Sequence, residues 1–133
     1  MKKITINLSF YNQDKILRKH VSRWSSWPQD ILQKFSFCII DDCSKNNAYE
    51  VLKGIEFSNI DLSIYRVQED LICNIAGVRN LSAKLCKTDW MLNLDMDTLI
   101  SKDFAIAILN LIKNKQIGNC YKFNRRVNKN PFH

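Results

Sequence analysis

The stretch Trp90-Met91-Leu92-Asn93-Leu94-Asp95-Met96-Asp97 joins an apolar run to two carboxylates that are one residue apart. The apolar run is typical of a buried strand. Because side chains alternate along extended backbone, Asp95 and Asp97 should lie on the same side, where their charges repel unless a cation or hydrogen-bond donors lie between them. The stretch predicts a site for a hard divalent metal. The alternative is that Asp97 only precedes the next helix and Asp95 lies in solvent.

Length and composition predict one folded domain. The chain has 133 residues, of which 46% are hydrophobic and 25% charged, with three glycines and two prolines. This composition is that of a globular protein rather than a disordered one, so we expect residues 1–133 to form a single domain. The N-terminal apolar run is too short for a signal peptide, and no stretch approaches membrane-spanning length. We therefore expect a cytoplasmic protein, with at most a peripheral contact to a membrane.

Charge and cysteine content narrow the choice of partners. The formal net charge is +7 and the pI is near 9.3, which favours anionic partners without distinguishing nucleic acid, nucleotide phosphates and anionic membrane. Basic residues gather toward the C-terminus, where a solvated basic face is the simplest interpretation. Five cysteines without a Cys-x-x-Cys pair, and only two histidines, indicate neither a zinc site nor a disulfide framework.

Apolar periodicity along the chain alternates between that of strands and that of helices. Such alternation is typical of an α/β layered domain with a mostly parallel sheet. In such sheets ligands bind outside the carboxyl ends of the strands, where the strand order reverses. The predicted elements are strands over 4–10, 35–40, 62–67 and 90–97, helices over 14–27, 48–53, 74–87 and 101–118, and the start of a fifth strand over 119–123.

Polar residues mark the helix boundaries. We predict Asn12, Asn74 and Ser101 as N-caps, because their side chains can accept from the first free N–H groups of a helix. Gly118 is the predicted end of the last helix. His20 falls on the apolar stripe of the first helix, and we interpret it as a core or boundary histidine rather than a catalytic one.

Polar side chains lie at the C-terminal ends of three of the four predicted strands. Because the carboxyl ends of parallel strands share one edge of a sheet, these side chains should lie near one crevice. They are Ser9, Tyr11 and Asn12 at the end of the first strand, Asp41 and Asp42 at the end of the second, and Asp95 and Asp97 at the end of the fourth.

Four segments, in this order and over about a hundred residues, resemble the motifs of the family 2 glycosyltransferases, which have the GT-A fold. Two departures are Cys43 and Ser82, which replace glycines of the family pattern. Residues 6–12 resemble the opening strand that ends in Thr/Ser-x-Tyr-Asn, 39–44 resemble Val-Asp-Asp-Gly-Ser, 74–83 resemble Gly-x-Ala-Arg-Asn-x-Gly-x-x-Ala, and 94–97 resemble Asp-x-Asp.

The resemblance implies a Rossmann-like GT-A nucleotide-diphospho-sugar transferase fold with a mostly parallel sheet of order 3-2-1-4, flanking helices and a truncated C-terminal side. The switch point then lies beside Tyr11 and Asp95. Residues 116–133 would begin the missing acceptor-binding half or form a basic tail. We therefore expect a fragment of a longer transferase, a short variant completed by another subunit, or a protein that binds a nucleotide-sugar without turning it over.

The resemblance also implies a nucleotide site. Ser9 and Tyr11 would pack and hydrogen-bond around the base, since an aromatic face can stack on it. Asp42 would accept from a uracil N–H, and the donor would be a UDP-sugar. The residues implied in nucleotide binding are Ser9, Tyr11, Asn12, Asp41, Asp42, Arg79 and Asp95.

A metal site is implied beside the nucleotide. Asp97, together with Asp95, would ligate Mn²⁺ or Mg²⁺ that bridges the diphosphate, while Asp95 would also face the ribose or a metal-bound water. Arg79, near the start of its helix, would hold the nucleotide or its phosphates through a charge-assisted fork. The alternative for Arg79 is a salt bridge with Asp70 or Asp95.

The implied reaction is metal-assisted transfer of the sugar to a saccharide, lipid or protein acceptor. The sequence offers no catalytic base, because residues 117–133 contain no acidic residue and His133 is the only group there with a suitable pKa.

Two other functions compete with glycosyl transfer. A nucleotidyltransferase would need a glycine-rich basic loop after the first strand, where this chain has Ser-Phe-Tyr-Asn-Gln. A non-catalytic module could bind a nucleotide-sugar, or dock its basic surface on anionic membrane, with nucleic acid a less favoured partner. Apolar surface left uncovered by a missing half would also promote self-association.

Overall fold

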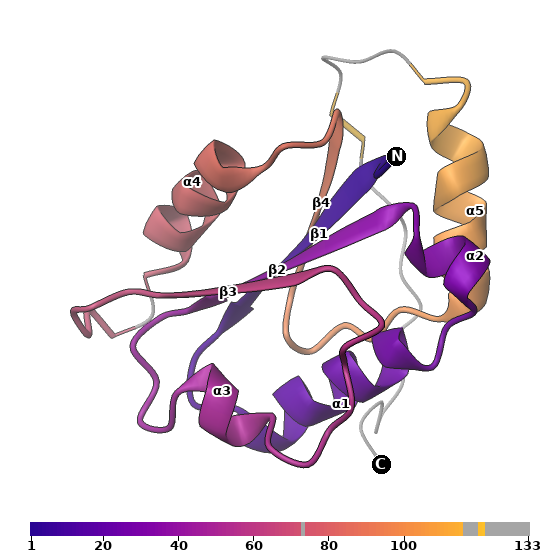
Figure 1. Cartoon of the computed structure of the whole chain (residues 1–133). Coiled ribbons are helices and arrows are strands. Elements are labelled where there is room, and N and C mark those ends of the chain that lie inside the picture. The colour runs from indigo at the N-terminus through magenta and orange to yellow at the C-terminus, as the bar shows by residue number, and fades with distance from the viewer. Residues whose placement is uncertain (73, 116–119, 122–133) are drawn as a thin grey trace.

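A computed structural model describes residues 1–72, 74–115 and 120–121 of the chain. Its four strands form one parallel sheet of order β3-β2-β1-β4 (Figure 1). This order and the alternation of strands and helices confirm the predicted architecture. The elements are β1 Ile4–Phe10, α1 Asp14–Ser25, α2 Gln29–Leu32, β2 Phe35–Asp41, α3 Ala48–Val51, β3 Leu62–Arg66, α4 Ile75–Leu85, β4 Trp90–Leu94 and α5 Lys102–Ile112.

The main core lies on the face of the sheet that α1, α2, α3 and α5 cover (Figure 1). Alternate residues of β1 and β2 point into it, as the pleat of a strand requires. Trp24 of α1 is fully buried and stacks on Phe37 of β2 with ring centroids 4.6 Å apart. His20, one turn earlier on α1, is also fully buried, so its predicted place in the core is confirmed.

Among the described helices, α4 alone covers the other face of the sheet, which is more polar (Figure 1). Its apolar cluster contains three buried residues, Cys38, Ile40 and Val78. Toward β4, two polar pairs replace apolar packing: Thr5 and Thr88 share a 2.6 Å hydrogen bond, and Asn7 Nδ2 donates to Asn93 Oδ1 at 3.4 Å. The residues of β1 that point to this face are therefore polar up to the end of the strand.

Two of the three predicted caps are confirmed. The Asn74 side chain accepts from Gly77 N at 3.1 Å, and Ser101 Oγ accepts from Phe104 N at 3.1 Å. The prediction for Asn12 is wrong, because α1 begins after Gln13 and that cap makes no side-chain hydrogen bond. Asn12 has a positive φ of 54° instead, which takes it out of the capping conformation.

The other differences concern element ends. The last helix ends at Ile112 rather than at Gly118, because the chain turns at Lys113 and Asn114 N donates back to the carbonyl of Leu111. The short helix α2 was not predicted. Gly118, His133 and three of the five residues of the predicted strand over 119–123 lie outside the described residues. No described helix has the length and apolar character needed to cross a membrane.

Candidate functional site

The predicted site residues gather at the carboxyl edge of the sheet, around the end of the central strand β1. Phe10, the last residue of β1, pairs with Asp41 of β2, and its carbonyl accepts from Asp42 N at 2.9 Å. On the other side of β1, Leu8 pairs with Leu94 of β4, so Asp95 follows at the same edge. This edge contains the reversal of strand order at which α/β sheets bind ligands.

Asp41 and Asp42 are both buried, but they point to different faces of the sheet. The Asp41 carboxylate accepts from Ser44 N at 2.8 Å and Ala48 N at 3.1 Å, and it pairs with Arg66 Nη1 at 2.7 Å. Both of its oxygens are therefore used within the protein. Asp41 is the last residue of β2, and its carboxylate holds the loop that leads to α3. Its predicted contact with the nucleotide stays a prediction.

Asn12 also serves this loop. Its side-chain oxygen accepts from Lys45 N at 2.7 Å, and its own backbone N–H donates to Ser44 Oγ at 3.0 Å. Without a ligand, the Asn12 side chain therefore contacts the protein itself, and its predicted contact with the nucleotide stays a prediction. Cys43, between the two segments, has a φ of 59°, a conformation that glycine adopts more easily. This explains why the family pattern has glycine at that position.

Asp42 differs from Asp41 in having one oxygen without a donor. Its Oδ2 accepts from Asn74 N at 2.7 Å and so ties the start of α4 to the edge of the sheet. Its Oδ1 is buried, and no donor among the described residues reaches it. An unpaired buried acceptor costs about 1–3 kcal/mol, and more when it is charged. Asp42 Oδ1 is therefore suited to accept an N–H from a ligand.

Tyr11 lies next to Asp42 and is half-buried. Its hydroxyl donates to the Asp70 carboxylate, at 3.0 and 3.2 Å from the two oxygens. This hydrogen bond to Asp70 raises the pKa of Tyr11, so the hydroxyl stays protonated at neutral pH. Asp70 also accepts from Ile72 N at 2.9 Å. The contact with Asp70, which fixes the ring position of Tyr11, was not predicted from the sequence.

Arg79 and Asp95 form an ion pair, with Arg79 Nη2 at 3.0 Å from Asp95 Oδ1. This is one of the two alternatives considered for Arg79. Both side chains are about half exposed, and such pairs contribute at most about 1 kcal/mol, so a ligand can replace the contact at little cost. Ser9, half-buried, follows the paired residue Leu8 and so lies at the same edge.

Asp97 is exposed, and the Met96 side chain before it is buried. His20 of α1 holds the backbone here, because its Nε2 donates to the Met96 carbonyl at 2.7 Å. A carbonyl can only accept, so His20 carries its proton on Nε2. Burial lowers the pKa of His20. No sequence pattern signals this contact, because the two residues are far apart along the chain.

The donor chemistry of this edge fits a hard divalent cation with few protein ligands. No group of three or more His, Cys, Asp or Glu side chains able to hold a metal occurs within the described ranges. Two carboxylates, Asp95 and Asp97, are exposed at the edge. Mg²⁺ and similar cations are often held by one or two carboxylates, with phosphates and water as the remaining ligands.

Known proteins were compared with this chain in fold and in sequence. The crystal structure of Staphylococcus aureus TarS 1-349 in complex with UDP-GlcNAc has a TM-score of 0.69 at 18% identity, over 84% of this chain and 31% of that one. The mannosyltransferase PcManGT from Pyrobaculum calidifontis, in complex with GDP-Man and Mn²⁺, has a TM-score of 0.65 at 16% identity, over 80% of this chain and 31% of that one. The chain thus spans about a third of their length. No curated protein matches it in sequence.

At these identities the structural likeness establishes the fold, which is that of the GT-A glycosyltransferases. The sequence model of the family described as Glycosyl transferase family 2 matches residues 5–133. That match includes all of the strands and helices described above except Ile4, the first residue of β1. On this ground, the chain belongs to glycosyl transferase family 2.

Proposed function

We propose that this chain is the donor-binding part of a glycosyltransferase that takes a nucleotide-diphospho-sugar, most simply a UDP-sugar, together with Mn²⁺ or Mg²⁺. The observation that carries the proposal is the unpaired, buried Oδ1 of Asp42 at the same edge as the exposed carboxylate of Asp97. Asp42 Oδ1 suits the nucleotide base, and the Asp97 carboxylate suits a metal-bound diphosphate. The UDP-GlcNAc and GDP-Man complexes of the two structural neighbours support this assignment.

The base end of the proposed site is built by Asp42 and Tyr11. Uracil presents one N–H between two carbonyls, and a single carboxylate oxygen can accept from it. Asp42 Oδ1 provides that acceptor without losing the bond of Oδ2 to Asn74 N. The Tyr11 ring, held through its hydroxyl by Asp70, offers an apolar face on which the base can stack.

The diphosphate end is built by Asp95, Asp97 and Arg79. Asp97 would hold the metal, with Asp95 facing the ribose or a metal-bound water. A bound Mn²⁺ or Mg²⁺ supplies positive charge that stabilises the departing nucleoside diphosphate. Arg79 would exchange its exposed contact with Asp95 for a phosphate oxygen, since guanidinium groups bind phosphates through parallel N–H donors. The acceptor, and the base that activates it, are not assigned.

Calorimetry of UDP binding in the presence of Mn²⁺ tests this proposal. We expect a binding heat that depends on the metal, and a loss of at least about tenfold in affinity for Asp97→Asn, because a charged ligand interaction is worth roughly 1.5–3 kcal/mol. Asp103→Asn is the matched control, since Asp103 is an exposed carboxylate in the first turn of α5. UDP binding that is indifferent to both Mn²⁺ and Asp97→Asn would overturn the proposal.

A further inference from the structure

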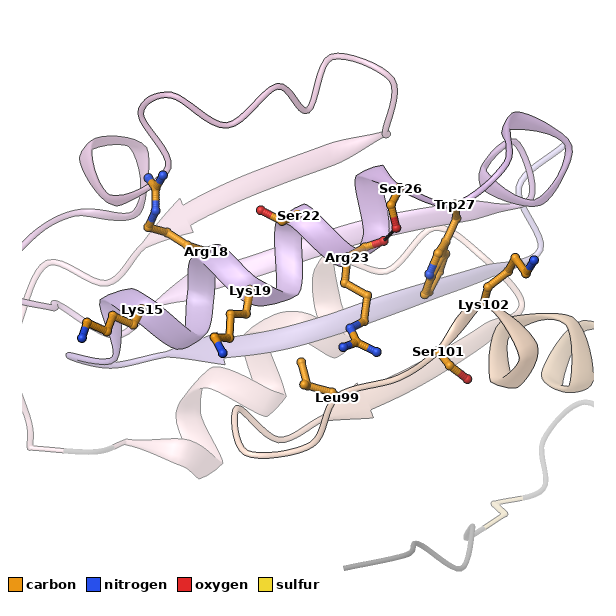
Figure 2. Close-up of a pocket in the computed structure, with 10 residues that line it drawn as sticks. All are labelled: Lys15, Arg18, Lys19, Ser22, Arg23, Ser26, Trp27, Leu99, Ser101 and Lys102. Atoms are coloured by element: carbon orange, nitrogen blue, oxygen red, sulfur yellow. Dashed lines mark hydrogen bonds between the residues drawn. The ribbon is translucent and has the colours of Figure 1, made fainter. Parts of the chain in front are cut away.

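A groove of about 740 Å³ lies along α1, outside the site described above (Figure 2). One wall is the exposed side of α1, and the other is the segment 99–102 that leads into α5. Figure 2 shows Lys15, Lys19 and Arg23 extending from α1 on the side that faces Leu99. None of the predicted nucleotide or metal residues lines this groove.

The groove is strongly basic. Of the ten described residues that line it, five are cationic and none is acidic. Within the described ranges, Lys15, Arg23 and Lys102 have no carboxylate within 4.0 Å. Asp14, the nearest acid in sequence to Lys15, accepts from Asn46 Nδ2 at 2.9 Å. Lys15, Arg23 and Lys102 therefore have no acidic partner among the described residues, so their charges attract anions.

Arg18 holds one end of the groove in place. Its Nη1 donates to the carbonyls of Val51 and Lys53, at 2.8 and 2.7 Å, and Figure 2 shows it turned away from Lys19 and Arg23. This contact ties α1 to the end of α3. Lys15 and Arg23 are eight residues apart on the same helix, which corresponds to about 12 Å along its axis. An extended chain with several anionic groups matches this spread better than a single phosphate does.

The lining also argues against a membrane or nucleic acid as the occupant. Trp27 is the only aromatic residue among the described residues of the lining, and it is 5% exposed because it packs against Phe35 and Phe37. Apart from the half-buried Leu99, the described lining residues therefore offer no exposed aromatic or long apolar side chain that could enter a bilayer or stack on bases.

The position of the groove points to the acceptor. Leu99 lines the groove and is two residues beyond Asp97. The segment that joins them follows Met96, whose carbonyl accepts from His20 of α1. Resting on the proposed function, we infer that this groove binds an acidic saccharide chain, carrying carboxylate or phosphate groups, as the acceptor for the transferred sugar. The cations bind the anionic groups of the chain, and its end lies near the donor site.

Fluorescence anisotropy of the full chain with labelled oligogalacturonate and with a labelled phosphomannan fragment tests this inference. We expect at least one of the two probes to bind, and Lys15→Gln/Arg23→Gln to weaken that binding about tenfold, because each exposed charge contact contributes up to several-fold. Lys84→Gln/Lys87→Gln removes the same charge from exposed positions on and just after α4, on the other face of the sheet. That control should change the affinity less than twofold.

Three results would overturn the inference: binding of neither probe, equal weakening by both double variants, or tighter groove-dependent binding of single-stranded DNA or phosphatidylglycerol vesicles. UDP and Mn²⁺ calorimetry on the same proteins separates the two proposals. An unchanged UDP affinity in Lys15→Gln/Arg23→Gln would show that the groove is distinct from the donor site. Groove-dependent probe binding without any UDP binding would retain the saccharide site and overturn the donor site.

Discussion

At the scale of single residues, Asp41 and Asp42 show how two adjacent carboxylates acquire different roles. Asp41 continues β2 on the side of the main core and uses both oxygens for Ser44, Ala48 and Arg66. Asp42 points to the opposite side and leaves Oδ1 without a donor among the described residues. One carboxylate stabilises the fold, and the other is available to a ligand.

Replacement of each carboxylate by its amide should separate these roles. Asp42→Asn can still accept from Asn74 N, but it presents an NH₂ group where a ligand N–H would bind, so we expect UDP affinity to fall at least about tenfold. Asp41→Asn places a donor against Ala48 N and Arg66, so we expect a loss of about 2 kcal/mol in the free energy of unfolding. Urea unfolding and UDP calorimetry measure the two effects. If both variants lost UDP affinity and stability to the same extent, the separate roles of Asp41 and Asp42 would be contradicted.

His20 should make the stability of the domain depend on pH. Burial lowers its pKa below the ordinary value of 6.5, against opposing contributions from Met96 and Asp97, while Arg23 adds to the lowering. As the pH falls below about 6.5, the unfolded chain takes up a proton that the folded chain resists, so the free energy of unfolding decreases toward acid.

Urea unfolding between pH 5.5 and 7.5 measures this dependence. We expect His20→Gln to flatten the decrease, because the substituted side chain does not titrate in this range. The matched control is His133→Gln, which removes the other histidine of the chain and should leave the decrease unchanged. If the free energy of unfolding fell equally with pH in wild type and His20→Gln, groups other than His20 would cause the decrease.

At the scale of elements, the start of α4 connects the fold to the site. The Asn74 side chain caps the helix through Gly77 N, while the Asn74 backbone N–H donates to Asp42 Oδ2. A Cβ atom at Gly77 would collide with the Asn74 side chain. Glycine is therefore needed at this position for the cap to form, and the cap positions the residue that holds Asp42.

Gly77→Ala should weaken both stability and UDP binding. We expect a loss of about 1 kcal/mol in the free energy of unfolding, which is typical of a lost N-cap, and a several-fold loss of UDP affinity because Asn74 moves. Gly54→Ala is the control: its φ of +84° penalises alanine by about 1–2 kcal/mol, but nothing lies within 4 Å of the added Cβ. An unchanged UDP affinity in Gly77→Ala would show that the Asn74 cap does not position Asp42 for UDP binding.

At the scale of the whole molecule, the two faces of the sheet differ in chemistry. The face under α1, α2, α3 and α5 is apolar and holds the main core, whereas the face under α4 is polar toward β4. The donor residues lie at the carboxyl edge, and the basic groove lies on the outer side of α1. The proposed donor and acceptor sites are therefore joined by the short segment between Asp97 and Leu99.

Much of this arrangement could be predicted from local sequence. Alternating periodicities identified four strands and the longer helices, and the caps Asn74 and Ser101 followed from side chains that accept from the first turn of a helix. The resemblance to family motifs supplied the strand order and brought the polar strand ends to one edge. These features are determined by short stretches of sequence, because periodicity and capping depend on near neighbours.

The tertiary structure alone decided which polar groups remain available to a ligand. The side chains of Asp41 and Asn12, for which nucleotide binding stays a prediction, contact residues up to 33 positions away along the chain. The contact of His20 with Met96 and the basic groove beside α1 also join segments that are distant in sequence. The sequence by itself determined the elements and the edge that carries the site. The roles of individual residues depend on long-range packing, which brings together donors and acceptors that no local pattern relates.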